Sequence, residues 1–190
     1  MNKADLASVG SPEGLSRGLQ LPAAMSALLC DVLPRANGFN AAMSVIDDVC
    51  QAILGDGLLS RNKVSALAAN VDESEFQRLW SSNPHAYPAA GLKRKTLTPW
   101  SRQLLLRHEI FVGEGDAALA AVFDDHARIE ALGLHSVVNV SLLMKGSCAA
   151  TMSVLGSQEK WLPCEVTLIC LLAVLATPWV LSESSSIPAR

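Results

Sequence analysis

This chain of 190 residues lacks the features that identify several common protein classes. Only 5% of its residues are aromatic, whereas half are hydrophobic, so its core must be built mainly from aliphatic side chains. The net charge is −3, and the longest basic run is only Lys93 to Lys95. A nucleic-acid-binding protein needs a clustered basic face. We therefore expect no nucleic-acid partner, and the short basic run fits a solvated strand end or turn.

Motifs for nucleotide binding and for nucleophilic catalysis are also missing. The sequence contains no G-x-x-x-x-G-K-[ST] loop, no G-x-G-x-x-G turn and no G-x-S-x-G elbow. Its five cysteines form no C-x-x-C pair, and all but Cys164 sit in apolar runs: Cys30, Cys50, Cys148 and Cys170. A free cysteine in such a run behaves as a small buried hydrophobe. A reducing, cytoplasmic location is the simplest expectation.

The most hydrophobic segment is TLICLLAVLA, Thr167 to Ala176. A membrane-spanning helix needs about 20 mostly apolar residues, and the apolar window 166–181 is shorter and contains Pro178. Pro163 and Glu165 just before it suit the first turn of a helix in water. We therefore predict a buried helix and no membrane partner.

The same helix is apolar on more than one side, so it needs more than one covering surface. The stripe through Leu168, Leu171, Leu172 and Leu175 differs from the stripe through Val166, Ile169, Ala173 and Ala176. One stripe can pack on a sheet. The other predicts cover either by the N-terminal helices or by the same helix of a second copy.

Periodicity predicts the other elements. Apolar residues recur at helical spacing over 21–33, and Pro34 ends that helix; a second helix has Asn40 as N-cap and stops at Gly55. The remaining expectations before the middle of the chain are a strand at 63–69, a short helix at 72–80 from the capping-box pattern DESE, a strand at 89–97, a helix opening at Thr98-Pro99, a strand at 109–113 and short helices over 116–123 and 124–133.

A β-hairpin is the clearest pattern in the sequence. Strands at 136–143 and 148–155 flank a turn at Lys145-Gly146, with aliphatic residues at every second position of the first strand. Strands in the middle with long helices at both ends predict an α+β fold. We expect a central antiparallel sheet with the N- and C-terminal helices on one face. The domain should span 21–181, between flexible segments 1–20 and 182–190.

From Ala127 to Ala176 the sequence resembles the C-terminal half of a GAF domain. The residues that carry the resemblance are Gly133, Ser136, Val138, Val140, Gly146, Trp161 and Glu165. The sequence departs from the family at Ser141, where proline is frequent, and at the extra helix predicted over 72–80.

The resemblance implies a small-molecule pocket on the sheet face opposite the terminal helices. Its roof would be the connection from Trp100 to His135, and the domain would dimerise through its terminal helices. It also implies a role as a sensor or regulatory module for a small organic ligand. The resemblance does not identify that ligand or any cofactor.

Polar residues within the expected roof and on the hairpin are the candidate ligand-binding residues. The segment FDDHARIEALGLH offers an arginine to hold a carboxylate and histidines to exchange protons. The alternative is that Asp124 or Asp125 only caps a short helix. Asn139 and Ser141 share one strand face, which is either the pocket floor or a half-solvated surface. The candidates are Trp100, Asp124, His126, Arg128, His135, Asn139, Ser141 and Cys148.

Two other functions stay open at this point. The same pocket could serve an enzyme, either a thiol-based reductase using Cys148 or an acid–base catalyst using His126 or His135. The helices could also belong to a ligand-free dimerisation module. No metal is expected, because Asp124, His126 and His135 match no established ligand spacing.

Overall fold

A computed structural model describes residues 21–65, 73–89 and 92–184. The flexible segments predicted at 1–20 and 182–190 lie outside the described residues, except that 182–184 continue the last helix. The helices are α2 (Ala23–Ala27), η2 (Leu28–Val32), η3 (Leu33–Arg35), α3 (Phe39–Leu54), α4 (Pro99–Ser101), η4 (Arg102–Leu106), α5 (Asp116–Val122), α6 (His126–Ala131) and α7 (Pro163–Ser184). The strands are β1 (Gly57–Ser65), β2 (Glu73–Ser81), β3 (Lys93–Thr96), β4 (Phe111–Glu114), β5 (Ser136–Met144) and β6 (Ser147–Gly156).

The strands form one antiparallel sheet in the order β3-β2-β1-β6-β5-β4. The predicted hairpin is confirmed as β5 and β6, which lie near the middle of the sheet. Its turn places Lys145 and Gly146 at φ of 51° and 80°, the left-handed conformation that a tight two-residue hairpin turn needs. The α+β prediction is therefore correct.

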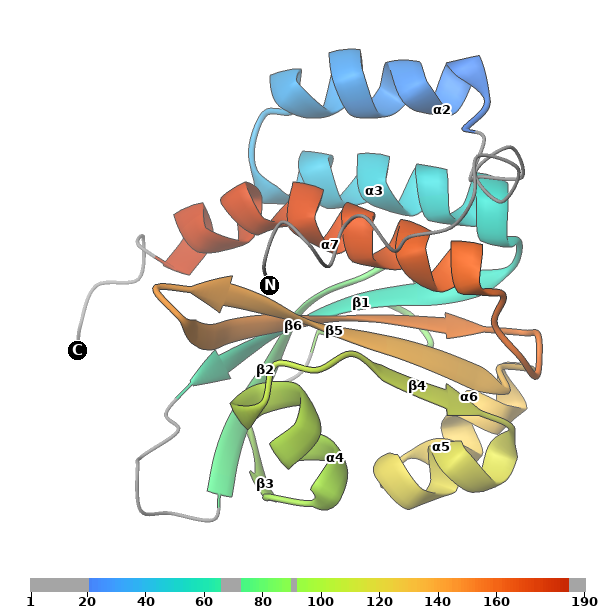
Figure 1. The fold of residues 1–190 in the computed structure, drawn as a ribbon, viewed down its shortest axis with the longest axis vertical. Coiled ribbons are helices and arrows are strands. Elements are labelled where there is room, and N and C mark those ends of the chain that lie inside the picture. Colours follow the sequence, from blue (N-terminus) through green and yellow to red (C-terminus); the bar gives the residue numbers. More distant parts are fainter. Residues whose placement is uncertain (1–20, 66–72, 90–91, 185–190) are drawn as a thin grey trace, which may run out of the picture.

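Helices cover both faces of the sheet (Figure 1). The long helices α3 and α7 pack on one face, and α2 lies outside α3. The short helices α4, α5 and α6 lie on the opposite face. The predicted packing of the terminal helices on one face is confirmed, and the main aliphatic core lies between them and the sheet.

The two N-terminal helices form as predicted, with differences at their ends. The first continues through Pro34 as a short 3-10 turn that ends at Arg35. The second begins at Phe39, so Asn40 is not its N-cap; Gly38, with a φ of 94°, occupies that position. A glycine tolerates this conformation without strain, which lets the chain turn sharply between the two helices. Gly55 ends α3 as expected.

Helix α7 is buried along one side and exposed along the other. Its buried residues are Leu168, Ile169, Leu172, Ala173 and Ala176. Exposed apolar residues line the opposite side: Leu171 (51%), Val174 (67%) and Leu175 (39%). The division into two apolar stripes predicted from the sequence therefore does not match the structure, because residues of both stripes are buried. The helix passes through Pro178 to Ser184. Among the described residues, no helix is both long and apolar enough to cross a bilayer.

The helix predicted at 72–80 is wrong, because Glu73–Ser81 form strand β2. This segment pairs with β1 on one side and β3 on the other. Ladder hydrogen bonds to two neighbours outweigh a local capping-box pattern, which is a weak preference by itself. The correction changes the site as well, since alternate residues of β2 face the pocket side of the sheet.

Two other strands shift relative to their predicted positions. Strand β1 starts at Gly57 rather than residue 63, and 66–69 lie outside the described residues. Strand β3 (Lys93–Thr96) covers only the later part of the predicted span 89–97, of which 90–91 lie outside the described residues. The β1 shift has a packing reason: Leu58 and Leu59 are both buried, one on each face of the sheet.

Arg61 is an unusual member of the helix-facing core. Its side chain is fully buried, and its guanidinium carbon lies 4.9 Å from the centre of the Phe39 ring. A guanidinium over a ring face gains a cation–π attraction that is larger when water is excluded. Arg61 thus joins β1 to the first turn of α3.

Candidate ligand-binding site

The sheet face below the short helices carries a band of short polar side chains across its three central strands. Cross-strand pairing places Ser60, Ser153 and Asn139 in one row. Asn62, Thr151 and Ser141 form the next row. We call these two rows the polar floor. Most of its members are buried, so their hydroxyl and amide groups need hydrogen-bond partners inside the protein or in a bound molecule.

Asn139 connects the polar floor to the roof above it. Its Oδ1 accepts a hydrogen bond from Trp100 Nε1 at 3.0 Å, and its Nδ2 donates to Ser153 Oγ at 2.7 Å. Asn139 itself has no exposed surface. The amide therefore holds the indole ring of α4 at a defined place over the sheet.

Trp100 is also the centre of an aromatic cluster. Its ring centre lies 6.1 Å from Phe76 in a stacked arrangement and 6.5 Å from Phe111 edge-on. Phe123, between α5 and α6, lies 6.2 Å away at a tilt. These distances are within the range of favourable aromatic pairs. Although the chain has few aromatic residues, three of them gather around Trp100 in the roof.

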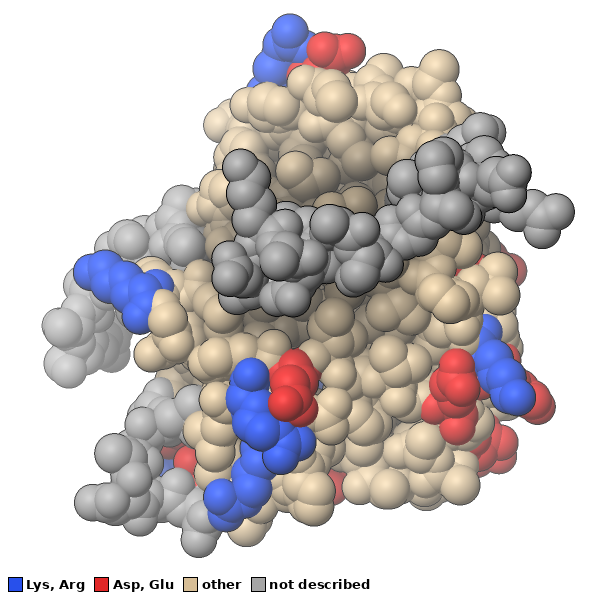
Figure 2. Space-filling view, in the orientation of Figure 1, with Lys and Arg blue, Asp and Glu red and all other residues tan. Residues whose placement is uncertain are grey.

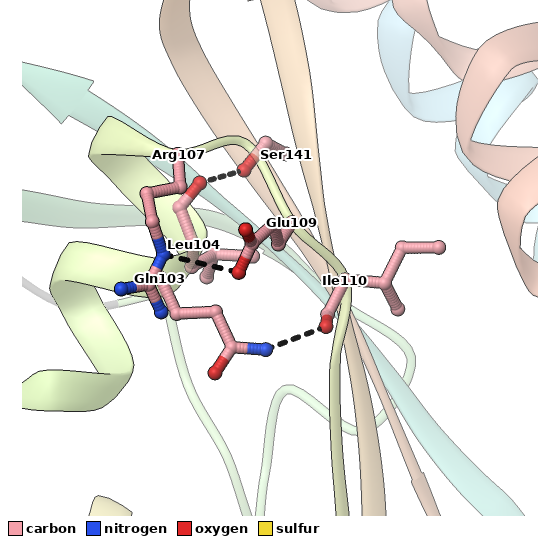
Figure 3. A network of polar contacts seen from close by, with 6 residues as sticks. All are labelled: Gln103, Leu104, Arg107, Glu109, Ile110 and Ser141. Atoms are coloured by element: carbon pink, nitrogen blue, oxygen red, sulfur yellow. Dashed lines mark hydrogen bonds and ion pairs between the residues drawn. The ribbon is translucent and has the colours of Figure 1, made fainter.

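Local bonds attach the roof to the sheet. Thr98 caps α4 as predicted, since its Oγ1 accepts from the Ser101 amide at 3.2 Å and Ser101 Oγ accepts from the Thr98 amide at 2.6 Å. Beyond α4, Ser141 Oγ donates to the carbonyl of Leu104, and Gln103 Nε2 donates to the carbonyl of Ile110 at 2.8 Å (Figure 3). These contacts tie η4 to β5 and to the start of β4.

Two cavities share Trp100 as a lining residue, and only the first of them is lined by residues of the polar floor. The first, which we call the inner pocket, has a volume of about 60 Å³. The second, which we call the outer cavity, measures about 290 Å³. The inner pocket is lined by Ser60, Asn62, Phe76, Arg78, Tyr87, Lys93, Trp100, Phe123, Asp125, Thr151 and Ser153. The outer cavity is lined by Arg94, Thr96, Thr98, Trp100, Val122 and Asp124.

Charged groups lie at one side of the inner pocket. The guanidinium of Arg78 stacks on the ring of Tyr87, 3.6 Å from its centre, and Nη1 donates to the carbonyl of Pro88 at 3.0 Å. Burial raises the pKa of the Tyr87 hydroxyl well above its usual value, and the nearby carboxylate of Asp125 adds to this. Tyr87 therefore stays neutral at physiological pH.

Several residues predicted from the sequence meet at this place. Trp100 lines both cavities. Asn139 and Ser141 belong to the polar floor but line neither cavity, and they bond to Trp100 and to Leu104 instead. Asp124 lines the outer cavity, while its neighbour Asp125 lines the inner pocket. Asp125 occupies the N-cap position of α6 without a capping side-chain bond.

The other predicted residues lie elsewhere. His126 and Arg128 belong to α6 and line neither cavity, although the charge of Arg128 acts on Tyr87. His135 Nδ1 lies 2.7 Å from Asp116 Oδ1, at the start of β5. Cys148 is buried in an apolar cluster, where its Sγ donates to the carbonyl of Ala150 at 3.2 Å. Burial raises the pKa of the Cys148 thiol.

The structure adds pocket residues that sequence reasoning missed, mainly on β1 and β2. Ser60, Asn62, Phe76 and Arg78 went unrecognised because β1 was placed too late and β2 was predicted as a helix. The alternation of side chains along a strand could have identified them. Phe76 and Arg78 are two residues apart, as are Ser60 and Asn62, so each pair lies on one face of its strand. Thr151 and Ser153 already alternated in the predicted hairpin.

Comparison with known proteins agrees with this arrangement. Neither a family model nor a curated protein matches the sequence. The GAF domain of an Acinetobacter phosphoenolpyruvate-protein phosphotransferase is similar in structure: its TM-score is 0.62 at 10% identity, over 90% of this chain and 100% of that domain. This chain has a GAF-like fold.

Two further solved structures share the GAF-like fold. The GAF domain of a two-component sensor histidine kinase from Bacillus halodurans has a TM-score of 0.58 at 11% identity, over 75% of this chain and 93% of that one. The chromophore-binding domain of an unusual bacteriophytochrome from R. palustris has a TM-score of 0.59 at 12% identity. The match covers 86% of this chain and 62% of that domain. The GAF-like fold thus occurs in sensor proteins.

Replacing Asn139 should weaken the whole fold. In Asn139→Ala the indole N–H of Trp100 loses its acceptor, and a fully buried site loses volume. We expect the free energy of unfolding to fall by about 2–4 kcal/mol, measured by urea denaturation followed by circular dichroism. Asn40→Ala, at an exposed position of α3, should change it by less than about 0.5 kcal/mol. Equal effects of the two substitutions would contradict this account of Asn139.

The His135–Asp116 contact should appear in the titration of the imidazole. The hydrogen bond to the Asp116 carboxylate raises the pKa of His135 in the folded state. The resulting stabilisation is therefore present below the unfolded-state pKa and is lost as the pH rises through the folded-state pKa. Asp116→Asn should lower the pKa of His135, as followed by NMR, while Asp56→Asn should leave it unchanged. An unshifted His135 titration in Asp116→Asn would refute the role of this contact.

Proposed function

We propose that this protein is a sensor or regulatory domain that binds a small molecule in the inner pocket. The observation that carries the proposal is the polar floor, which lies in the middle of a sheet under an aromatic roof. Asn139 and Ser141 are hydrogen-bonded within the protein, whereas Ser60, Thr151 and Ser153 line the inner pocket, where a bound molecule can reach their hydroxyl groups. A concave site with aromatic walls and a few convergent polar groups is the usual form of a small-molecule site.

The enzyme alternatives gain no support from the pocket. Cys148 faces an apolar cluster instead, and burial raises the pKa of its thiol, which disfavours the nucleophilic thiolate. His126 and His135 line neither cavity, so neither is placed to exchange a proton with a molecule bound there. A cytoplasmic location belongs to the proposal as well, since all the cysteines are free thiols.

Ligand binding can be tested on the purified full chain. Mass spectrometry of small molecules released on denaturation should identify the ligand, and a thermal-shift screen of metabolites should find compounds that raise the midpoint as their concentration rises. Ser60→Ala removes one hydroxyl of the polar floor and should weaken binding of the identified compound about fivefold.

Ser44→Ala, at an exposed position of α3, is the matched control and should bind with unchanged affinity. The proposal fails if no compound stabilises the protein. It also fails if Ser60→Ala and Ser44→Ala bind the compound equally well.

We also propose that the protein forms a homodimer through its terminal helices, with α7 at the interface. The exposed apolar residues of α7, Leu171, Val174 and Leu175, follow one another along a single side of the helix. Where the face shown in Figure 2 is described, the helical layer carries few charged side chains. Apolar surface with few charges at its centre is typical of homodimer interfaces.

A charged substitution on this side of α7 should separate the subunits. We expect Leu171→Glu to be a monomer by light scattering at concentrations where the unmodified protein is a dimer, because an uncompensated carboxylate would be buried in the contact. Leu106→Glu, at a similarly exposed leucine of η4, should leave the dimer intact. A monomeric unmodified protein would end this part of the proposal.

A further inference from the structure

We propose that the ligand of the inner pocket is a compact monoanion, a short-chain carboxylate whose charge is bound by Arg78 of β2. This inference rests on the proposed function, because it specifies the class of molecule that the inner pocket binds. It assigns the anion-binding role to Arg78, which lies in β2 and not in the roof segment that contains Arg128.

Arg78 is held in position but keeps a free donor. Stacking on Tyr87 and the bond from Nη1 to the carbonyl of Pro88 fix the plane of the guanidinium. Its Nε is buried and has no hydrogen-bond partner among the described residues. A guanidinium group matches a carboxylate in both charge and geometry. Arg78 also lines the inner pocket, so a carboxylate bound there can pair with its guanidinium group.

The charges around the inner pocket favour one negative charge on the ligand. Arg78 and Lys93 are cationic, and Asp125 is the carboxylate that faces the same space. None of the ion pairs between described residues involves Arg78 or Lys93. The three side chains leave a formal surplus of one positive charge, which a monoanion neutralises. A phosphate dianion would exceed that surplus and lie close to Asp125.

The size of the pocket limits the ligand to a few heavy atoms. Its volume is about 60 Å³. An apolar cavity of about 150 Å³ is of the size that binds benzene, so an aromatic acid, which is larger than benzene, is too large for the inner pocket. Isobutyrate has as many heavy atoms as benzene, so we take it as the upper limit of ligand size.

The remaining walls match the two ends of such an acid. The polar floor offers the hydroxyl groups of Ser60, Thr151 and Ser153 as further donors for carboxylate oxygens. Phe76, Trp100 and Phe123 form an apolar wall for the hydrocarbon part. A ligand with an anionic end and a short apolar end satisfies both surfaces at once.

Three probes of similar size test the inference on the full chain. Isobutyrate carries one negative charge, isobutyramide is its neutral counterpart, and methyl phosphate is a dianion at mildly alkaline pH. Binding is measured by thermal shift and by calorimetry at matched ionic strength. We expect isobutyrate to bind at least about tenfold more tightly than either of the other two probes, since a charge-assisted bond is lost with the amide.

Substitutions of arginine identify the residue responsible. Arg78→Gln should weaken isobutyrate binding at least about tenfold. Arg78→Lys should recover part of the affinity, because it keeps the charge but not the planar fork. Arg35→Gln, at an exposed arginine of η3, should bind like the unmodified protein. Lys93→Gln should also weaken isobutyrate binding, because it removes the second cationic group of the pocket. Urea denaturation verifies that each variant is folded.

The inference is overturned if isobutyramide or methyl phosphate binds as tightly as isobutyrate. It is also overturned if no probe binds, or if a folded Arg78→Gln variant keeps full affinity. A neutral or dianionic compound recovered from the purified protein would refute the ligand class and leave the proposed function standing. Absence of any small-molecule ligand in the metabolite screen would refute both.

Discussion

The amide of Asn139 joins the two halves of this domain. It has no exposed surface and lies in the middle of the sheet, where an unpaired amide would cost several kcal/mol. The fold meets this requirement by placing Trp100 above it and Ser153 beside it. The position of α4, and with it the shape of the inner pocket, depends on this pair of hydrogen bonds.

The two faces of the sheet differ in the kind of side chain that they bury. Between the sheet and the helices α3 and α7, aliphatic side chains pack into a closed core, with Arg61 as its largest polar member. On the opposite face the central strands carry serine, threonine and asparagine. The short helices there contribute buried aliphatic residues such as Leu119 and Ile129 and also Trp100, which lies within reach of Phe123. The scarcity of aromatic residues in the sequence thus has a structural meaning, because several of those present surround Trp100. The face toward α3 and α7 holds the main hydrophobic core, and the opposite face holds the inner pocket.

The sequence predicted the elements whose signal is local. The hairpin alternates over both strands, and α7 is continuously apolar, so both are recognisable without knowledge of their neighbours. Strand β2 is harder to recognise, because its segment opens with a capping-box pattern and its conformation depends on pairing with β1 and β3. For the same reason Trp100, Asn139 and Ser141 were identified as site candidates while Arg78 was not. Its place beside Tyr87 results from a loop and a strand pairing that no spacing rule describes.

The two outer strands of the sheet also affect how the protein behaves at high concentration. An unpaired strand edge can recruit the strand of another molecule and begin aggregation. Here β3 consists largely of lysine and arginine, and β4 is only four residues long. Strands that are charged or short are poor templates for continued pairing. Growth of the sheet from molecule to molecule into fibrils is therefore disfavoured at both edges.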